Sequence, residues 1–354
     1  MSFDLHKLIR NNIRDLQPYS SARDEFSGEA KVFLDANENS LGSPLIQWYN
    51  RYPDPHHRRL REKLSAIKGI APEHIFIGNG SDECIDLLYR CFSEPGKSNT
   101  IICPPTYGMY EVSANINDVK VVRAPLLPDY QLDLVHLEQL VNEDTRIIWI
   151  CSPNNPTGNL MQWQDVETIL NHFNGLVVVD EAYINFARQR SWITALTDYP
   201  NLVVLQTLSK AWGLAGLRIG MAFASTAIIE VLQRVKPPYN ISQPAQELAL
   251  QALDEVEQVN DMIRLLADMR EALVEVLASM PEVEMVYPSD ANFLLVKIRD
   301  ARKVYEFLLG DGIVVRDRSK VQLCEDCLRI TVGTEQENTQ LVDALIRWHE
   351  SVIK

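Results

Sequence analysis

The fold is decided by the segment Leu176-Val177-Val178-Val179-Asp180-Glu181-Ala182-Tyr183, in which four apolar residues lead directly into two carboxylates. A short, continuous apolar run of this kind is typical of a strand that is buried on both faces of a parallel sheet. A carboxylate at the end of such a strand is costly to bury unless it meets a cation or hydrogen-bond donors. Asp180 is therefore predicted to face a cationic ligand group, such as a protonated ring nitrogen, with Tyr183 nearby. The alternative is that Asp180 only caps a following helix.

Six further runs of β-branched and apolar residues lie before and after this strand, at residues 75–77, 100–103, 120–122, 147–151, 202–206 and 219–222. Stretches with helical apolar spacing separate several of them, at residues 83–92, 135–141 and 164–172. This alternation predicts an α/β large domain, built on a mostly parallel seven-stranded sheet sandwiched by helices.

The pattern changes near Ser242, where Ser242 and Pro244 indicate the start of a helix that continues to about Met280. Strands at 292–297, 313–316 and 327–332 follow, with a helix at 301–309 and a closing helix from Glu335. The sequence thus predicts an N-terminal arm (1–30), a large domain (31–243) and a small C-terminal α+β domain (244–354).

Composition limits the partners of the protein. The 354 residues are 46% hydrophobic and 23% charged, which excludes a disordered chain and a disulfide scaffold. The formal net charge of −14 argues against nucleic acid and anionic membrane as partners. No apolar run reaches the roughly 18 residues of a membrane span, and the charged N-terminus is unlike a secretory signal. A cytoplasmic location with reduced cysteines is expected. Cys324 and Cys327 form an isolated CxxC, so no metal site is predicted.

Three other predicted strands end in polar segments, and ligands of open α/β sheets bind beyond the carboxyl ends of the strands. Residues 77–83 pass through glycines into a helix start near Ser81, whose free N–H groups favour a phosphate, or form a simple capped turn. Residues 151–158 contain two Asn, two Pro and a Gly, which form either a rigid turn that aims an Asn side chain or a plain loop. Residues 207–218 place Lys210 in a small, apolar stretch, and burial makes a lysine amine a nucleophile for carbonyls.

In this order and spacing, the segments resemble the fold-type I aminotransferases, which use pyridoxal 5′-phosphate (PLP). The resemblance covers nearly the whole chain and rests on residues 155–158, 180–183, 209–211, 216–218 and 329–333. Within that family the chain is most similar to the histidinol-phosphate aminotransferase subgroup, through residues 19–23, 34–39, 50–55, 313–317 and 328–333. The resemblance implies ping-pong transamination between histidinol phosphate or imidazole-acetol phosphate and glutamate or 2-oxoglutarate, in histidine biosynthesis.

The resemblance also implies roles for single residues. Lys210 would hold PLP as an internal Schiff base (an aldimine) and move the substrate proton, which makes it catalytic together with Asp180 and Tyr183. Asp180 would keep the pyridine nitrogen protonated. Tyr183 and Asn155 would hydrogen-bond the ring hydroxyl, and Tyr107 would stack on the ring face.

The cofactor phosphate would lie at the helix start, and the residues implied there are Gly80, Ser81, Asp82, Ser209, Thr207 and Arg218. Tyr52 would reach the phosphate from the neighbouring subunit, which implies a homodimer with shared active sites.

The substrate anion would be bound by Arg329, with Arg316 as a second candidate unless Arg316 pairs with Asp317 or Asp311. Tyr19 and Asn37 would line the substrate side. Residues 251–290 carry a net charge of −8, so the acidic total lies far in sequence from a small positive pocket.

Two other functions of the same fold remain open, an aromatic amino acid aminotransferase and an enzyme like threonine-phosphate decarboxylase. A non-catalytic PLP-fold module of a transcription regulator is disfavoured, because the N-terminal arm is too short for a DNA-binding domain and the chain is acidic.

Overall fold

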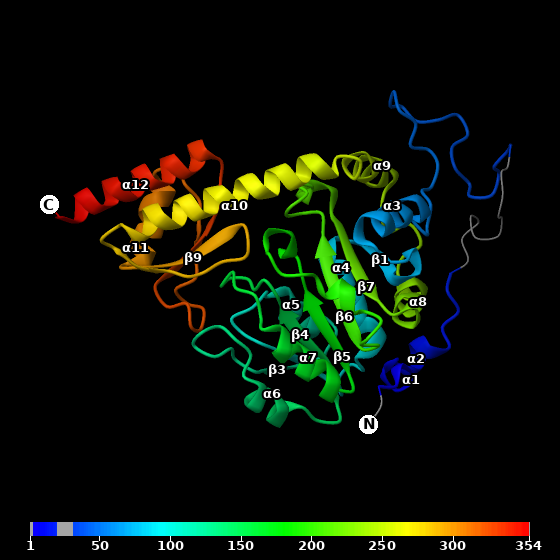
Figure 1. The fold of residues 1–354 in the computed structure, drawn as a ribbon. Coiled ribbons are helices and arrows are strands. Elements are labelled where there is room, and N and C mark those ends of the chain that lie inside the picture. The colour runs from blue at the N-terminus through cyan, green and yellow to red at the C-terminus, as the bar shows by residue number, and fades with distance from the viewer. Residues whose placement is uncertain (1–2, 20–30, 354) are drawn as a thin grey trace.

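The computed structural model describes residues 3–19 and 31–353, which form one body around two sheets (Figure 1). Most of the 19–23 motif, and the part of the predicted arm at 20–30, lie outside the described residues. The large sheet has the order β1-β7-β6-β5-β4-β2-β3. Its strands are β1 (Ile75–Asn79), β2 (Asn99–Ile102), β3 (Lys120–Arg123), β4 (Thr145–Cys151), β5 (Leu176–Asp180), β6 (Leu202–Thr207) and β7 (Ile219–Ala224). Strands β2 to β6 pair in parallel and β7 is antiparallel to both neighbours, which confirms the predicted mostly parallel seven-stranded sheet.

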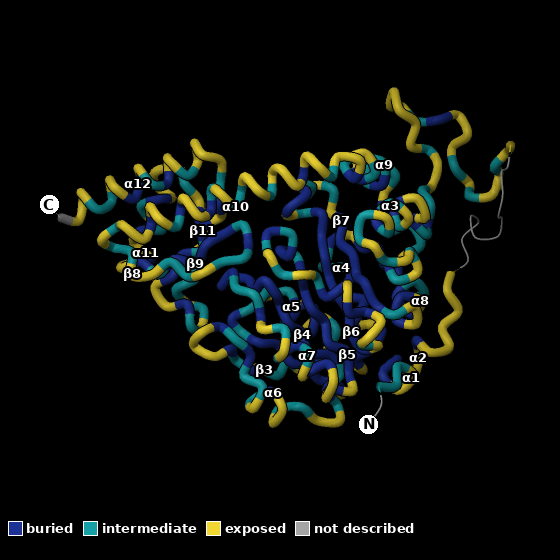
Figure 2. Tube along the Cα trace, viewed as in Figure 1, coloured by how far each residue is buried: buried dark blue, intermediate teal, exposed yellow. Residues whose placement is uncertain are grey.

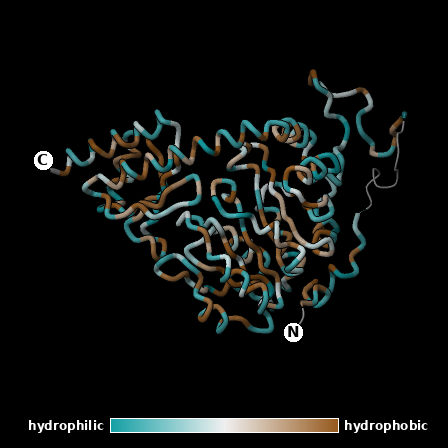
Figure 3. The backbone as a smooth tube through the Cα atoms, viewed as in Figure 1, coloured by the Kyte–Doolittle hydropathy of each residue, from teal (hydrophilic) through white to brown (hydrophobic). Residues whose placement is uncertain are grey.

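Strand β5 is the middle strand of the large sheet, and both of its faces are buried (Figure 2). Its side chains alternate between two core clusters, with Val177 and Val179 in one and Leu176 and Val178 in the other. The first cluster is covered by α3 (Arg58–Lys68), α6 (Leu134–Leu140) and α7 (Trp163–His172), and the second by α4 (Gly80–Phe92), α5 (Met109–Ile116) and α8 (Thr226–Val235). Figure 3 shows the same concentration of hydrophobic residues inside the sheet.

The small sheet is antiparallel, with the order β10-β11-β9-β8. Its strands are β8 (Val283–Val286), β9 (Phe293–Ile298), β10 (Arg316–Asp317) and β11 (Cys327–Thr331), and its helices are α11 (Ala301–Gly310) and α12 (Glu335–Ile353). Strand β8 was not predicted from the sequence. The strand predicted at 313–316 is shortened, because the Ile313 N–H donates to Leu308 O (2.8 Å) and closes the end of α11 instead.

The continuous helix predicted from Ser242 to about Met280 is wrong. Two helices occupy this range, α9 (Gln243–Ala252), which packs on α3, and α10 (Val256–Ala278), which extends to the small sheet (Figure 1). Leu253, at the break, is fully buried, and its neighbour Asp254 pairs with Lys63 of α3. These contacts redirect the chain, although the apolar period continues through the break. The boundaries at 30/31 and 243/244 remain predictions.

The remaining short elements are α1 (Leu5–Leu8), α2 (Asn11–Arg14) and the 3₁₀ turns η1 (Pro72–His74), η2 (Ile184–Phe186), η3 (Trp192–Ala195) and η4 (Ala215–Leu217). Leu8 and Ile13 of the first two helices are buried against the core beside α4. No helix in the described part of the chain is long and apolar enough to cross a membrane.

His57 begins α3 in an unusual state. It is fully buried, has a positive φ of 50°, and neither ring nitrogen has a hydrogen-bond partner among the described residues. Burial, followed by the nearby Lys236 charge, lowers the pKa of His57 to about 3. The His57 imidazole is therefore much harder to protonate in the folded protein than in the unfolded chain, where its pKa is about 6.5.

We expect this histidine to make the protein less stable in acid. Its folded pKa is depressed, so the unfolded state binds more protons between about pH 3 and pH 6.5, and stability falls as the pH drops through that window. At pH 5.5 the loss due to His57 is about 1 kcal/mol. Asparagine tolerates positive φ and does not titrate, so His57→Asn is a suitable variant. Its unfolding free energy is measured in denaturant at pH 7.5 and 5.5. The decrease between the two pH values is expected to be smaller than in the wild type by the amount that His57 contributes. Equal changes in the two proteins would contradict the assignment.

Candidate active site

The polar ends of four strands meet at one edge of the large sheet. Cys151, Asp180 and Thr207 end the neighbouring parallel strands β4, β5 and β6. Strand β7 runs the other way, so Arg218, which precedes it, lies at the same edge, beside the end of β1. These ends surround a cavity of about 630 Å³, within the size range of small-molecule sites. Twelve of the residues predicted for the site line it: Ser81, Asp82, Tyr107, Asn155, Asp180, Tyr183, Thr207, Ser209, Lys210, Arg218, Arg316 and Arg329.

Asp180 provides a carboxylate in the wall of this cavity and is only 3% exposed. Its Oδ2 accepts a hydrogen bond from the Tyr110 hydroxyl (2.7 Å), and its Oδ1 accepts one from the Ala182 N–H (3.0 Å). Both donors are neutral, and burial raises the pKa of Asp180 above the usual range of an aspartate. A cation placed next to Asp180 would reverse this shift by stabilising the ionised form.

Lys210 extends into the same cavity from the segment after β6, and its Nζ lies 5.5 Å from the centre of the Tyr183 ring. Partial burial, followed by the positive charge of Arg329, lowers the pKa of Lys210. This shift increases the share of neutral amine, which is the nucleophilic form. The side chain is nevertheless exposed to the open cavity, so its amine is accessible to a ligand.

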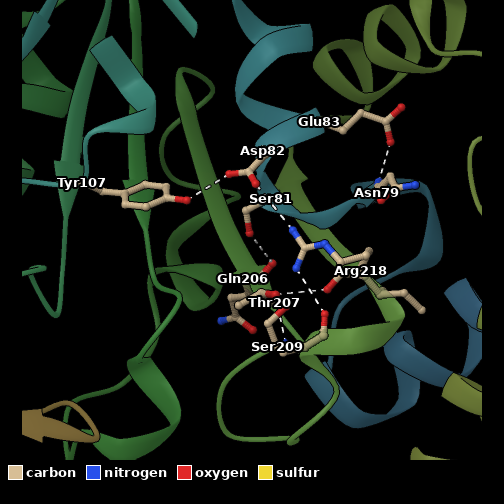
Figure 4. Close-up of polar contacts among 11 residues, drawn as sticks. Asn79, Ser81, Asp82, Glu83, Tyr107, Gln206, Thr207, Ser209 and Arg218 are labelled. Carbon is tan, nitrogen blue, oxygen red and sulfur yellow. Dashed lines mark hydrogen bonds and ion pairs between the residues drawn. The ribbon is translucent and has the colours of Figure 1, made fainter. Parts of the chain in front are cut away.

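The start of α4 forms a cradle of hydrogen-bond donors at one end of the cavity (Figure 4). Among the described residues no side chain caps the helix at Asn79, and the Gly80 N–H donates to Arg218 O (2.7 Å). The Arg218 guanidinium reaches back to Asp82 (3.5 Å), whose other oxygen accepts from the Tyr107 hydroxyl (3.1 Å). A Cβ on Gly80 would lie 2.7 Å from Arg218 Nη2, and Gly80 has a positive φ of 74°. Glycine therefore lets the guanidinium lie this close to the start of the helix. Helix N–H groups and a guanidinium are donors suited to a phosphate.

Gly220 of β7 packs directly against the backbone of Gly80 and Ser81 at the start of α4. A Cβ at Gly220 would lie 2.2 Å from the Ser81 backbone nitrogen and 2.3 Å from the Gly80 carbonyl carbon, so the start of α4 would have to move. We expect Gly220→Ala to lower the unfolding free energy by at least about 1–3 kcal/mol, measured by denaturant titration. The control is Gly310→Ala in α11, where a Cβ meets nothing within 4 Å. Equal stability of the two variants would contradict the close approach.

Arginines of the small sheet line the opposite side of the cavity. Arg316 of β10 lies opposite Arg329 of β11 in the backbone register of the two strands. The Nη1 of Arg329 donates to Asn155 Oδ1 (2.5 Å). The alternative that Arg316 pairs with Asp317 or Asp311 is wrong. Asp317 contacts Arg302 (3.3 Å) and Asp311 contacts Arg347 (2.7 Å).

The other predicted residues lie elsewhere in this chain. Gly80 shapes the cradle without lining the cavity. Asn37 and Tyr52 line a second cavity of about 490 Å³, and Tyr52 stacks on Tyr239 with ring centres 4.5 Å apart. Tyr19 is 73% exposed and does not line the first cavity. The roles predicted for Tyr19, Asn37 and Tyr52 remain predictions.

Among the residues of the site that sequence reasoning missed, Tyr110 and Arg318 bear most directly on its charge. Tyr110 was overlooked because the motif around Asp180 does not indicate which distant residue contacts its carboxylate. Arg318 also lines the cavity, and its signal was available, since it lies two residues after Arg316, just beyond a short strand. Cys324 and Cys327, outside the cavity, are buried free thiols.

Comparisons with known proteins agree with this architecture. The family model for aminotransferase class I and II matches residues 31–345. A histidinol-phosphate aminotransferase of Cytophaga hutchinsonii is 53% identical over 345 residues, which are 98% of this chain and 99% of the relative. One of Bacteroides fragilis is 48% identical over 97% of this chain and 99% of the relative. The crystal structure of histidinol-phosphate aminotransferase from Sinorhizobium meliloti in complex with pyridoxal-5′-phosphate has a TM-score of 0.79 and 25% identity, and covers 85% of this chain and 84% of that chain. The chain therefore belongs to the class I and II aminotransferase family.

Proposed function

We propose that this protein binds PLP and transfers the amino group between histidinol phosphate and 2-oxoglutarate, in histidine biosynthesis. The cavity fits the cofactor at three points. The start of α4, with Arg218, offers donors to its phosphate, and the missing side chain at Gly80 lets the Arg218 guanidinium lie beside that helix start. The buried Asp180 has only neutral donors and suits a protonated ring nitrogen. Lys210 supplies an accessible amine.

When bound, the cofactor supplies an aldehyde that condenses with amines and a protonated ring that withdraws electrons from the substrate carbon. The Asp180 carboxylate stabilises that proton, and the Tyr110 hydroxyl orients the carboxylate through its 2.7 Å hydrogen bond. The lowered pKa of Lys210 would let its Nζ accept the proton from the substrate Cα and return it to the cofactor carbon on the other side of the transferred nitrogen. Arg329, whose Nη1 donates to Asn155 Oδ1, holds the substrate anion in place for this transfer.

The observation that carries the choice of substrate is the arginine side of the cavity, which faces Lys210 without carboxylate partners for Arg316 or Arg329 among the described residues. Such a surface suits the phosphate of histidinol phosphate and, in the other half of the reaction, a carboxylate of glutamate. The relatives named histidinol-phosphate aminotransferase, similar over nearly the whole chain, support the same substrate.

The test compares amino donors with 2-oxoglutarate as acceptor. We expect kcat/KM for histidinol phosphate to exceed that for phenylalanine and histidinol by at least about 10²-fold, because a site built for a polar group rejects ligands that lack it. Threonine phosphate carries the phosphate and is included to test the decarboxylase alternative. Histidinol is the matched control, since it lacks only the phosphate. A wide margin for phenylalanine would indicate an aromatic aminotransferase, and CO₂ release from threonine phosphate would indicate the decarboxylase alternative.

We further propose that the enzyme is a homodimer in which Tyr52 reaches the active site of its partner. Residues 31–53 extend away from the body (Figure 1), and brown apolar stretches appear there in Figure 3. Six apolar side chains of this segment are more than half exposed: Val32, Leu34, Leu41, Leu45, Ile46 and Trp48. Exposure on this scale is typical of an interaction surface, and Tyr52 lies at its end, half-exposed and outside its own chain's cavity.

Mixing two variants tests this arrangement. If sites are shared, a heterodimer of Lys210→Ala and Tyr52→Ala chains contains one site with both residues intact. We expect activity at limiting cofactor to rise above the sum of the two homodimers after subunit exchange. Sedimentation shows whether heterodimers form. If heterodimers form without a gain in activity, Tyr52 does not contribute to the partner's active site. If the protein sediments as a monomer, the proposed homodimer is wrong.

A further inference from the structure

Arg318 lies just beyond β10, and its backbone extends the ladder of the small sheet. Its N–H donates to Cys327 O (2.9 Å), directly after the pairs of Arg316 with Arg329 and of Asp317 with Leu328. Side chains alternate along a strand, and paired residues share a face. Arg316, Arg318 and Arg329 therefore lie on one face, and all three line the cavity.

The same alternation separates these arginines from the nearest acid. Asp317, between two of them, lies on the other face, where its carboxylate contacts Arg302 of α11 (3.3 Å) and accepts from the Ser319 N–H (2.9 Å). The acid thus contributes to fixing the strand without neutralising the cavity side.

The three guanidiniums have no carboxylate partner within the described part of the chain. Arg329 donates to the neutral Asn155, and the Nε of Arg318 is buried without a hydrogen-bond partner there. Burial, and then the charge of a neighbouring arginine, lowers the pKa of both Arg318 and Arg329. Like charges at this density, partly removed from water, are costly without a counter-ion. The cluster therefore favours an anion with more charge and more acceptors than one guanidinium can satisfy.

We propose that Arg318 is a specificity-determining residue, which completes with Arg316 and Arg329 a three-arginine site for a dianionic phosphomonoester. A carboxylate has one charge and two oxygens, which a single bidentate arginine satisfies. A phosphomonoester has three terminal oxygens and nearly two charges at pH 7, so it gains from further guanidiniums. Arg318 thereby favours the phosphate substrate over the dicarboxylate that uses the same cavity. The identity of that substrate rests on the proposed function, whereas the choice of Arg318 rests on the pairing of β10 with β11.

The first test separates the two substrates. With the cofactor-loaded enzyme, we expect Arg318→Gln to raise KM for histidinol phosphate by about 10- to 100-fold, as for a lost charge-assisted hydrogen bond. KM for glutamate and kcat are expected to change less than about threefold. Arg318→Lys keeps the charge and should recover part of the loss. The matched control is Lys320→Gln, which removes a positive charge two residues away, from an exposed side chain outside the cavity. Equal KM increases for both substrates, or none, would overturn the proposal.

A second measurement is independent of turnover. Inorganic phosphate is titrated calorimetrically into the cofactor-loaded protein, in which the cradle at α4 is already filled. Binding is expected to weaken about tenfold in Arg318→Gln and to stay unchanged in Lys320→Gln. Wild-type protein that binds phosphate through Arg318 but does not transaminate histidinol phosphate would overturn the proposed function alone. Normal transamination with phosphate binding unaffected by Arg318→Gln would overturn the Arg318 assignment alone.

Discussion

Replacing Lys210 with alanine is expected to abolish transamination, with kcat falling at least about 10⁴-fold, because in the proposed mechanism one side chain both attaches the cofactor and moves the substrate proton. The structure places its amine in the cavity beside Tyr183, with a pKa lowered by partial burial and by Arg329. The measurement is single-turnover kinetics with histidinol phosphate, together with borohydride reduction of the cofactor-loaded protein and mass analysis of the peptide that contains Lys210.

Lys210→Arg is the matched control for this prediction. It keeps a positive charge in the cavity but offers no amine that is deprotonated near neutral pH. Both variants are expected to be inactive and to lack the borohydride-fixed adduct while remaining folded. An alanine variant that still transaminates and still forms the reducible adduct would place the cofactor on another residue.

The second large effect is expected for Asp180→Asn, which removes the buried carboxylate opposite the proposed ring nitrogen. Breaking a buried ion pair costs about 3–5 kcal/mol, so kcat should fall about 10²- to 10⁴-fold. Without cofactor the effect on stability has the opposite sign. The raised pKa of Asp180 indicates that the protein's own groups compensate its charge poorly, so the cofactor-free variant should unfold at or above the wild-type temperature near pH 8.

Tyr110→Phe provides the comparison for this position. It removes only the hydroxyl that donates to Asp180 (2.7 Å) and leaves the charge in place, so kcat is expected to fall by about tenfold or less. Equal losses in Asp180→Asn and Tyr110→Phe would mean that the carboxylate acts through its hydrogen bond and not through its charge.

Several parts of the fold and the site could be predicted because their signals are local. The apolar run of β5 determines a buried strand, and the carboxylate that follows must then lie at its end. The stretch around Lys210 and the helix start at Ser81 are equally local. Their common edge follows from the direction of parallel strands, which the alternation of strands and helices already implies.

Other features depended on contacts between distant segments. The apolar period could not reveal the break between α9 and α10, because the residues that redirect the chain meet α3 and not one another. Tyr110 and Asp180 are 70 positions apart and meet only through the packing of α5 on the sheet.

The sequence by itself therefore determined the strands of the large sheet, the cavity lysine, the carboxylate and the helix start, since each is set by residues next to one another. Only the tertiary structure decided how charges are paired. The register of β10 against β11 places Arg316, Arg318 and Arg329 on the cavity face and Asp317 on the other. Because a shift of one residue in that register would exchange the two faces, the proposed anion site is a property of strand pairing and not of any single motif.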